Sequence, residues 1–389
     1  MFKNQVNKFY LASFLKNQTY FVPIMVIFFQ DLGLSYSEIF WIYTMGSIFS
    51  FIIEIPTGLF ADIFGKRKSI ILSKLFIFIS FIFFGLATGF WSLILANLLY
   101  ELGKSFRSGT ETAFVYDYLA QTQGSPGYTR VKADQKFYAR LSESIGTAVG
   151  GFLAVKLGFS AVFFIAAIPA LINFLQTLSW VSIKENSEAY SLKSSLIFAG
   201  DSLRSLFKNK ILITIVMNIL IFTATLFAID KFIQPYMKAV GVELAYFGLI
   251  YSGFLLIIAF LVKYISKLED IYGGEKVMNF ISFFAFVPMI ILGLGYSGLL
   301  GIILFFLAIA VENVRSPIAN SVFHDNVESK NRATMGSILE LMKTSGKLVI
   351  LPVAGYLADS YSIQAAILIF SLVILISSIV FWLPSKKTA

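Results

Sequence analysis

The sequence predicts an all-α membrane protein with twelve transmembrane helices in two pseudo-symmetric six-helix halves. The 389 residues are 57% hydrophobic and 14% charged, with a mean hydropathy of +0.80, which exceeds what the core of a soluble protein requires. Apolar runs long enough to cross a bilayer, about 20 residues each, recur along the whole chain. The second half also repeats residues of the first half in the same order.

The expected spans form two sets of six. The first set lies near residues 6–30, 36–60, 68–89, 92–118, 135–156 and 160–181, and the second near 211–236, 244–264, 277–296, 299–323, 333–356 and 362–383. The chain thus divides into an N-terminal half, 1–181, a cytoplasmic linker, 182–210, and a C-terminal half, 211–389. In the linker, Leu192, Leu196 and Ala199 share one helical face opposite Lys193 and Asp201, which predicts an amphipathic helix at the membrane surface.

The positions of lysine and arginine predict the orientation. With both termini in the cytoplasm, 20 basic residues lie in inner segments and only Lys156 and Lys238 lie in outer loops. Because cytoplasmic loops retain basic residues, we expect a multi-pass protein of the plasma membrane or bacterial inner membrane. This topology accounts for the net charge of +9 without a nucleic-acid partner.

The composition argues against an enzyme. The chain contains no cysteine and a single histidine, and it has neither a nucleotide-binding glycine loop nor a metal-binding cluster. We therefore expect no cofactor and no metal, and we expect the protein to act as a monomer.

An internal repeat relates the two halves. The sequence Asp62-Ile63-Phe64-Gly65 recurs as Asp270-Ile271-Tyr272-Gly273, at an offset of 208 (270 − 62). Arg107 and Asp117 recur as Arg315 and Asp325 at the same offset. The repeat therefore predicts two six-helix halves in the same orientation.

The stretch from Glu54 to Lys68 is expected to be a short basic loop between the second and third spans. Within it, Gly58, Ala61, Asp62, Gly65, Lys66 and Arg67 resemble the signature loop of the major facilitator superfamily, Gly-x-Leu-Ala-Asp-Arg-x-Gly-Arg-Arg, with Phe60 at the leucine position. Ile63 departs from the basic residue of that signature. The resemblance implies a secondary transporter with alternating access, in which the first, fourth, seventh and tenth spans line a central cavity.

The resemblance also implies an inner gate at this loop. The expected gating residues are Glu54, Gly58, Asp62, Gly65, Lys66, Arg67, Asp117, Asp270, Gly273 and Asp325. A second stretch, Gly146-Thr147-Ala148-Val149-Gly150-Gly151, is similar to the Gly-Pro-x-x-Gly-Gly element of the drug/proton antiporters, with Thr147 in place of the proline. This similarity favours export, and the small residues permit close helix packing.

Ionisable residues inside the spans are the candidate site. A charge near the bilayer centre costs at least about 2.5 kcal/mol, so such groups normally face a cavity or a partner. On the fourth span, Glu101, Lys104, Arg107 and Glu111 are expected to share one helical stripe. The expected substrate-binding residues are Lys16, Asn17, Gln18, Tyr20, Lys104, Arg107, Asp230, Lys231, Gln234, Arg315, Lys343 and Lys347.

A carboxylate beside a cation can carry a coupling proton, and the candidates are Glu101, Glu111 and Glu312. The predicted function is therefore export of a small polar or charged organic solute across the membrane against proton entry. The alternatives are a proton-coupled importer of a metabolite or a metal chelate such as a siderophore, a lipid flippase, and a receptor that does not transport. For any single charged residue, mutual neutralisation within a helix is the competing interpretation.

Overall fold

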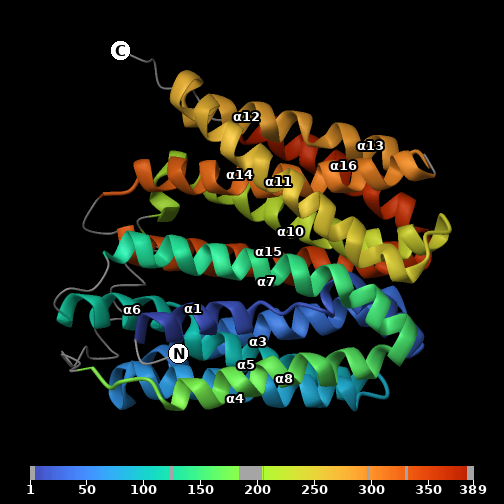
Figure 1. Ribbon diagram of the computed structural model, residues 1–389. Coiled ribbons are helices and arrows are strands. Elements are labelled where there is room, and N and C mark those ends of the chain that lie inside the picture. The colour runs from blue at the N-terminus through green and yellow to red at the C-terminus, as the bar shows by residue number, and fades with distance from the viewer. Residues whose placement is uncertain are drawn as a thin grey trace. The chain divides into compact units, whose positions relative to one another are not determined.

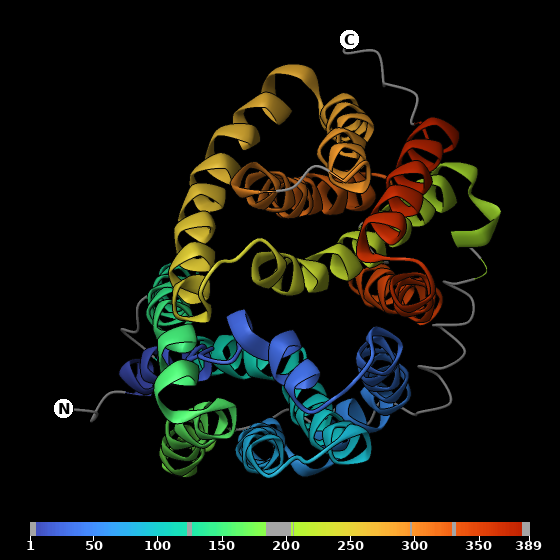
Figure 2. The same ribbon diagram turned by 90° about the vertical axis from the view of Figure 1, so that its right-hand side faces the viewer.

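The computed structural model describes residues 5–122, 127–183, 204, 206–295, 298–328 and 332–382. These residues form helices and connections, with no strand among them (Figure 1, Figure 2). The amphipathic helix expected in the linker falls mainly on residues outside this part of the chain.

The N-terminal half contains nine helical segments in the described residues. They are α1 (Gln5–Lys16), η1 (Val22–Ile24), α2 (Met25–Asp31), α3 (Tyr36–Phe64), α4 (Lys66–Gly85), α5 (Phe90–Arg107), α6 (Thr110–Gln121), α7 (Tyr128–Leu157) and α8 (Phe159–Leu178). The C-terminal half contains α10 (Lys210–Ala239), α11 (Leu244–Tyr272), α12 (Gly274–Phe284), α13 (Phe286–Gly293), α14 (Leu299–Asp325), α15 (Arg332–Ser360) and α16 (Ile363–Val380).

Seven helices in the described residues are long and apolar enough to cross a membrane, counting α12 and α13 as one. Two shorter apolar stretches, Val22–Asp31 and Leu244–Ile258, belong to further expected spans. Many large apolar side chains are exposed, such as Trp91 at 78%, which fits a surface in contact with lipid. The all-α membrane fold is confirmed, and the count of twelve crossings stays a prediction.

Three expected spans are discontinuous, so the prediction of one helix over each was wrong. The ninth is divided at Ala285 between α12 and α13, and the first and fourth have longer breaks. The first span stops at Lys16, where the Asn17 amide donates to the carbonyl of Ser13 at 2.6 Å, and helix resumes only near Pro23. The fourth span stops at Arg107 and resumes at Thr110, with Gly109 between them at φ +69°. That backbone conformation favours glycine and interrupts a right-handed helix.

The prediction of a loop from Glu54 to Lys68 was also wrong. Helix α3 continues to Phe64 despite Pro56, and the turn consists of Gly65 alone, at φ +96°. The hydroxyl of Thr57, the residue after Pro56, donates to the carbonyl of Ile53 at 2.8 Å. Gly273 makes the equivalent turn between α11 and α12 at φ +83°.

The chain forms two compact units that do not follow the two halves of the sequence strictly. Unit 1 comprises Met1–Leu34, Ile48–Tyr190 and Glu243–Ser252, and unit 2 comprises Ser35–Ser47, Ser191–Val242 and Gly253–Ala389. The first turns of α3 thus belong to unit 2, and the first turns of α11 belong to unit 1. Within unit 1, α4 packs against α5 and α8 (Figure 1), and within unit 2, α13 packs against α16.

Specific contacts hold the first turns of α3 in unit 2 and the first turns of α11 in unit 1. In unit 2, the Asp359 carboxylate accepts hydrogen bonds from the backbone N–H groups of Tyr36 and Ser37, at 2.9 and 2.8 Å. These are N–H groups of the first turn of α3, which lack partners within the helix. In unit 1, Gly248 of α11 lies directly against the carbonyl of Thr147, and a β-carbon at Gly248 would overlap that oxygen.

Candidate functional site

The charged residues of unit 1 gather at the breaks in the two discontinuous spans of this unit, the first and the fourth. Lys16 is the last residue of α1, Arg107 is the last residue of α5, and Glu111 lies in the first turn of α6. Helix C-termini favour cations and helix N-termini favour anions. Each charge therefore occupies the helix end that stabilises its sign, and the breaks create these ends inside the expected spans.

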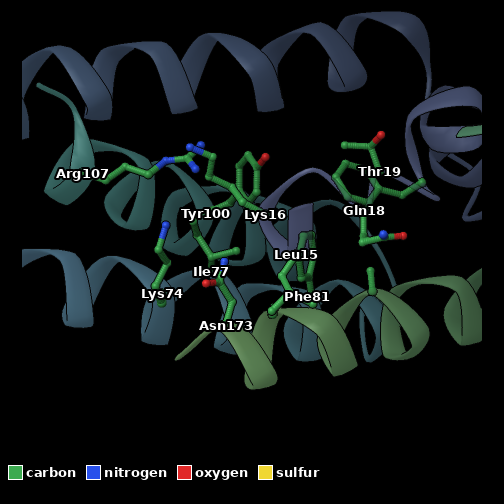
Figure 3. A pocket seen from close by; sticks show the side chains of 13 residues that line it. Leu15, Lys16, Gln18, Thr19, Lys74, Ile77, Phe81, Tyr100, Arg107 and Asn173 are labelled. Atoms are coloured by element: carbon green, nitrogen blue, oxygen red, sulfur yellow. The ribbon is translucent and has the colours of Figure 1, made fainter. Parts of the chain in front are cut away.

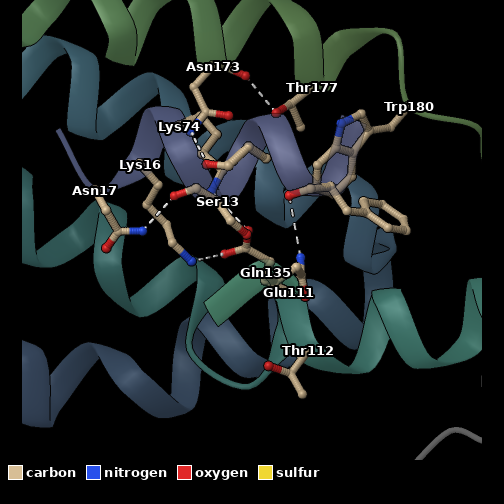
Figure 4. A network of polar contacts seen from close by, with 12 residues as sticks. Ser13, Lys16, Asn17, Lys74, Glu111, Thr112, Gln135, Asn173, Thr177 and Trp180 are labelled. Carbon is tan, nitrogen blue, oxygen red and sulfur yellow. Dashed lines mark hydrogen bonds and ion pairs between the residues drawn. The ribbon is translucent and has the colours of Figure 1, made fainter. Parts of the chain in front are cut away.

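Glu111 is the centre of this cluster (Figure 4). One carboxylate oxygen lies 3.2 Å from the ammonium of Lys16, and the other lies 3.3 Å from the ammonium of Lys74 on α4. Glu111 is 7% exposed and Lys74 is 2% exposed. Charges buried this deeply must be paired, because an isolated one would lose several kcal/mol of hydration.

Arg107 adds a third cation beside this pair. Figure 3 shows its side chain directed toward Lys16 across a small pocket. Its Nη1 atom is buried and has no hydrogen-bond partner among the described residues. With Lys16, Lys74 and Arg107 charged and Glu111 ionised, the cluster carries an excess of two positive charges, which suits an anionic ligand.

Lys16 borders more than one cavity among the residues that the structure describes. The pocket of Figure 3 holds about 30 Å³ and is lined by Lys16, Lys74 and Arg107 together with Tyr100 and Asn173. The second, of about 330 Å³, is lined by Arg107, Ser108 and Glu54. The third, of about 440 Å³, lies on the α7 side of Lys16 and Glu111. The ion pair between Lys16 and Glu111 therefore lines both the second and the third cavity.

The remaining candidates of the fourth and first spans have more local partners. The ammonium of Lys104 lies 2.8 Å from the carboxylate of Glu101, one turn away on α5. Because the helix breaks after Arg107, Glu111 does not continue their stripe, and that expectation was wrong. Gln18 is buried beside the small pocket, and Tyr20 packs against the apolar cluster around Ile24.

Arg315, the repeat equivalent of Arg107, has different surroundings. It is 0% exposed within unit 2, donates to Ser282 and Asn218, and lies 4.1 Å above the ring of Phe222. Glu312 lies 3.8 Å from its guanidinium and accepts a hydrogen bond from Thr223 at 2.8 Å. These contacts describe a packed arginine, and its binding to substrate stays a prediction.

The other candidates of unit 2 also have partners on neighbouring residues. Lys343 lies 2.7 Å from Glu340, and Lys231 lies 2.7 Å from Asp230. The ammonium groups of Lys231 and Lys347 lie 4.7 and 4.3 Å from the centre of the Phe227 ring. Gln234 is buried in α10. Mutual neutralisation accounts for the two ion pairs, and substrate contact by these residues stays a prediction.

The expected gating residues meet only in part. Lys66, at the start of α4, forms an ion pair with Asp117 of α6. Arg67 instead donates to the carbonyl of Leu178 at 2.6 Å, at the end of α8. The side chain of Asp62 is exposed near the end of α3. A gating role for these residues stays a prediction.

The other expected gating positions lie near helix ends. The Ser108 hydroxyl donates to Glu54 at 3.4 Å. Gly58 is a helical residue of α3, Gly65 and Gly273 form the turns, and Asp270 and Asp325 lie in the last turns of α11 and α14.

Sequence reasoning missed Lys74 as a partner of Glu111. The two residues are 37 positions apart on different helices, so no helical spacing connects them. The only signal in the sequence is a lysine inside an apolar run. It also missed Gln135 and Thr112, which line the third cavity and carry no charge.

The profile of the Major Facilitator Superfamily matches residues 10–236 and 231–389. The chain belongs to this superfamily. It is therefore a secondary transporter and a multi-pass membrane protein rather than an enzyme.

Several members of the superfamily align with nearly the whole chain. An uncharacterized MFS-type transporter of Bacillus subtilis (strain 168), YxaM, is 23% identical over 393 residues, covering 94% of this chain and 92% of the relative. Multidrug resistance protein MdtG of Proteus mirabilis (strain HI4320) is 23% identical over 384 residues, with the same coverage of 94% and 92%.

Solved structures share the fold. The nucleoside transporter NupG superposes with a TM-score of 0.81 at 18% identity, covering 97% of this chain and 98% of NupG. A POT family transporter in complex with a thioalcohol-conjugated peptide gives a TM-score of 0.74 at 14% identity, covering 96% of this chain and 94% of that one.

Proposed function

We propose that this transporter moves a small organic anion across the plasma membrane in a proton-coupled cycle, with Glu111 as the carboxylate that carries the proton. The observation that carries the proposal is the buried carboxylate of Glu111, shared by Lys16 and Lys74 next to an unpartnered nitrogen of Arg107. We place both termini in the cytoplasm, following the distribution of basic residues.

Competition for Lys16 supplies the coupling. An anionic group that binds Arg107 and Lys16 withdraws Lys16 from Glu111, so the ionised carboxylate loses a partner and takes up a proton. By reciprocity, a protonated Glu111 releases Lys16 for the anion. Anion and proton therefore bind together, which favours their movement in the same direction.

Exchange is the second candidate, and the names of the multidrug resistance relatives favour it. A zwitterion could place its carboxylate on Arg107 and its amine on Glu111. The amine would then compete with the proton, and the inward proton gradient would drive export.

Proteoliposomes under an imposed pH gradient distinguish the two candidates. Three probes share a four-carbon chain and differ in charge: succinate, 4-aminobutyrate and putrescine. With the outside acidic, we expect inward accumulation of succinate and none of putrescine. Expulsion of preloaded 4-aminobutyrate by the same gradient would instead support exchange.

The variant Glu111→Gln identifies the coupling group. We expect it to lose accumulation driven by the gradient while retaining exchange of labelled for unlabelled succinate without a gradient. Glu101→Gln is the matched control, because Glu101 pairs locally with Lys104, and it should retain coupling. Accumulation by Glu111→Gln at the wild-type level would refute the assignment and direct attention to Glu312, then to Asp230 and Glu340.

A further inference from the structure

The coupling scheme above uses only one wall of the cavity of about 440 Å³ between α1, α6 and α7, the wall that contains Lys16 and Glu111. Lys16 and Glu111 form its wall toward the proposed coupling site, and Thr112, Lys132, Gln135 and Lys136 contribute further polar lining. Lys16, Glu111 and Thr112 also line the cavity beside Arg107, so the two cavities share these three side chains.

The charge of this cavity is positive. Lys132 and Lys136 are four residues apart on α7, so their side chains are neighbours on one helical face and repel each other. Lys132 donates to the hydroxyl of Thr112 at 3.2 Å, and burial lowers the pKa of Lys132. The repulsion between the two ammonium groups and the cost of burying the Lys132 charge both decrease when an anion enters between the two groups.

Gln135 gives the cavity a hydrogen-bond acceptor that needs a donor. Its side chain is 7% exposed, and its amide nitrogen donates to the carbonyl of Phe9 at 3.5 Å. Its oxygen Oε1 is buried without a hydrogen-bond partner among the described residues. A buried acceptor without a donor is costly. Because Gln135 lines the cavity, rotation of its amide can turn Oε1 toward a ligand, and a ligand that supplies an O–H or N–H group then gains affinity.

We propose that this cavity is a second binding site for organic anions, selective for those with a hydrogen-bond donor next to the carboxylate, such as hydroxycarboxylates. Lys132 and Lys136 bind the anionic group, and Gln135 accepts the hydrogen bond from the hydroxyl. The proposal rests on the proposed function in one respect, because the anion would pass from here to Arg107 when Lys16 leaves Glu111.

A unique cysteine can report occupancy, because the chain contains none. Ala139 also lines the cavity, one turn beyond Gln135, so Ala139→Cys places a thiol there. The measurement is the rate at which N-ethylmaleimide labels this thiol in the purified full-length protein. The probes are malate and succinate, which have the same charge and differ by one hydroxyl group.

We expect both anions at tens of millimolar to slow labelling, with malate half-protecting at about a fivefold lower concentration because its hydroxyl satisfies Gln135. Adding Lys132→Gln and Lys136→Gln should abolish protection by both anions. Adding Gln135→Leu should remove only the advantage of malate. Val155→Cys, an exposed position near the other end of α7, should be labelled at the same rate with and without anion.

Absence of protection by either anion would overturn the proposal, as would equal protection in the double lysine variant. This assay requires no transport, so its outcome is independent of the pH-gradient experiment. Protection of the thiol without gradient-driven accumulation would refute the coupling scheme and leave this binding site. Gradient-driven accumulation without protection would refute the binding site alone.

Discussion

Replacing Glu111 with glutamine should destabilise unit 1 strongly. The change leaves the ammonium of Lys74, 2% exposed, without the carboxylate that lies 3.3 Å from it, and it removes the partner of Lys16 as well. Breaking a buried ion pair by removing one partner costs about 3–5 kcal/mol. We expect a loss of this size in the free energy of unfolding.

Two further variants separate the interaction energy between Lys74 and Glu111 from the effect of losing either side chain. Lys74→Met leaves Glu111 with Lys16 and should cost less, about 1.5–3 kcal/mol. The double variant Lys74→Met, Glu111→Gln removes both charges, and it should be more stable than the sum of the two losses by about 1–3 kcal/mol. Glu101→Gln is the control on a more exposed pair and should cost less than about 1 kcal/mol.

The assay is unfolding of the purified protein by sodium dodecyl sulfate in mixed micelles, followed by circular dichroism. Additivity of the two single losses within about 0.5 kcal/mol would refute the reasoning, because it would mean that Lys74 and Glu111 do not interact. A Glu111→Gln protein as stable as the wild type would refute it equally.

Two other predictions concern the helix ends. Asp62→Asn should lower the transport rate while leaving abundance and substrate affinity nearly unchanged, if Asp62 acts in the inner gate; a wild-type rate of succinate transport would remove that role. Gly248→Ala should destabilise the protein because its β-carbon overlaps the carbonyl of Thr147, whereas Gly253→Ala on the same helix meets nothing within 4 Å and serves as the control. Equal unfolding midpoints for the two variants would contradict the close contact.

Composition and repetition were enough to predict the fold. Hydropathy identifies transmembrane segments because the bilayer imposes one length and one polarity on every span. The internal repeat also placed the turns at Gly65 and Gly273 in equivalent positions, and both have positive φ. Helix length at the turn was not predictable, because Glu54 to Phe64 continues α3 in spite of Pro56 and its charges.

The members of the charged cluster in unit 1 could be singled out from the sequence, but their arrangement could not. Lys16, Arg107 and Glu111 stood out because charges inside spans are costly. Their geometry depends on the break at Gly109, which removes Glu111 from the stripe of Glu101 and Lys104. The repeat likewise predicted equal roles for Arg107 and Arg315, whereas local residues such as Ser282 and Asn218 give Arg315 its own partners.

The first turns of α11 belong to unit 1, and this affects how the protein can assemble during synthesis. The chain emerges N-terminus first, and domains generally fold as they are completed. Unit 1 needs residues 243–252, which are made after the linker and after all of α10. Until then the small-residue face of α7 around Thr147 lacks its neighbour from α11. A ribosome must therefore complete more than half of the chain before the first unit can close, and a fragment that ends at residue 181 lacks a part of the unit to which it belongs.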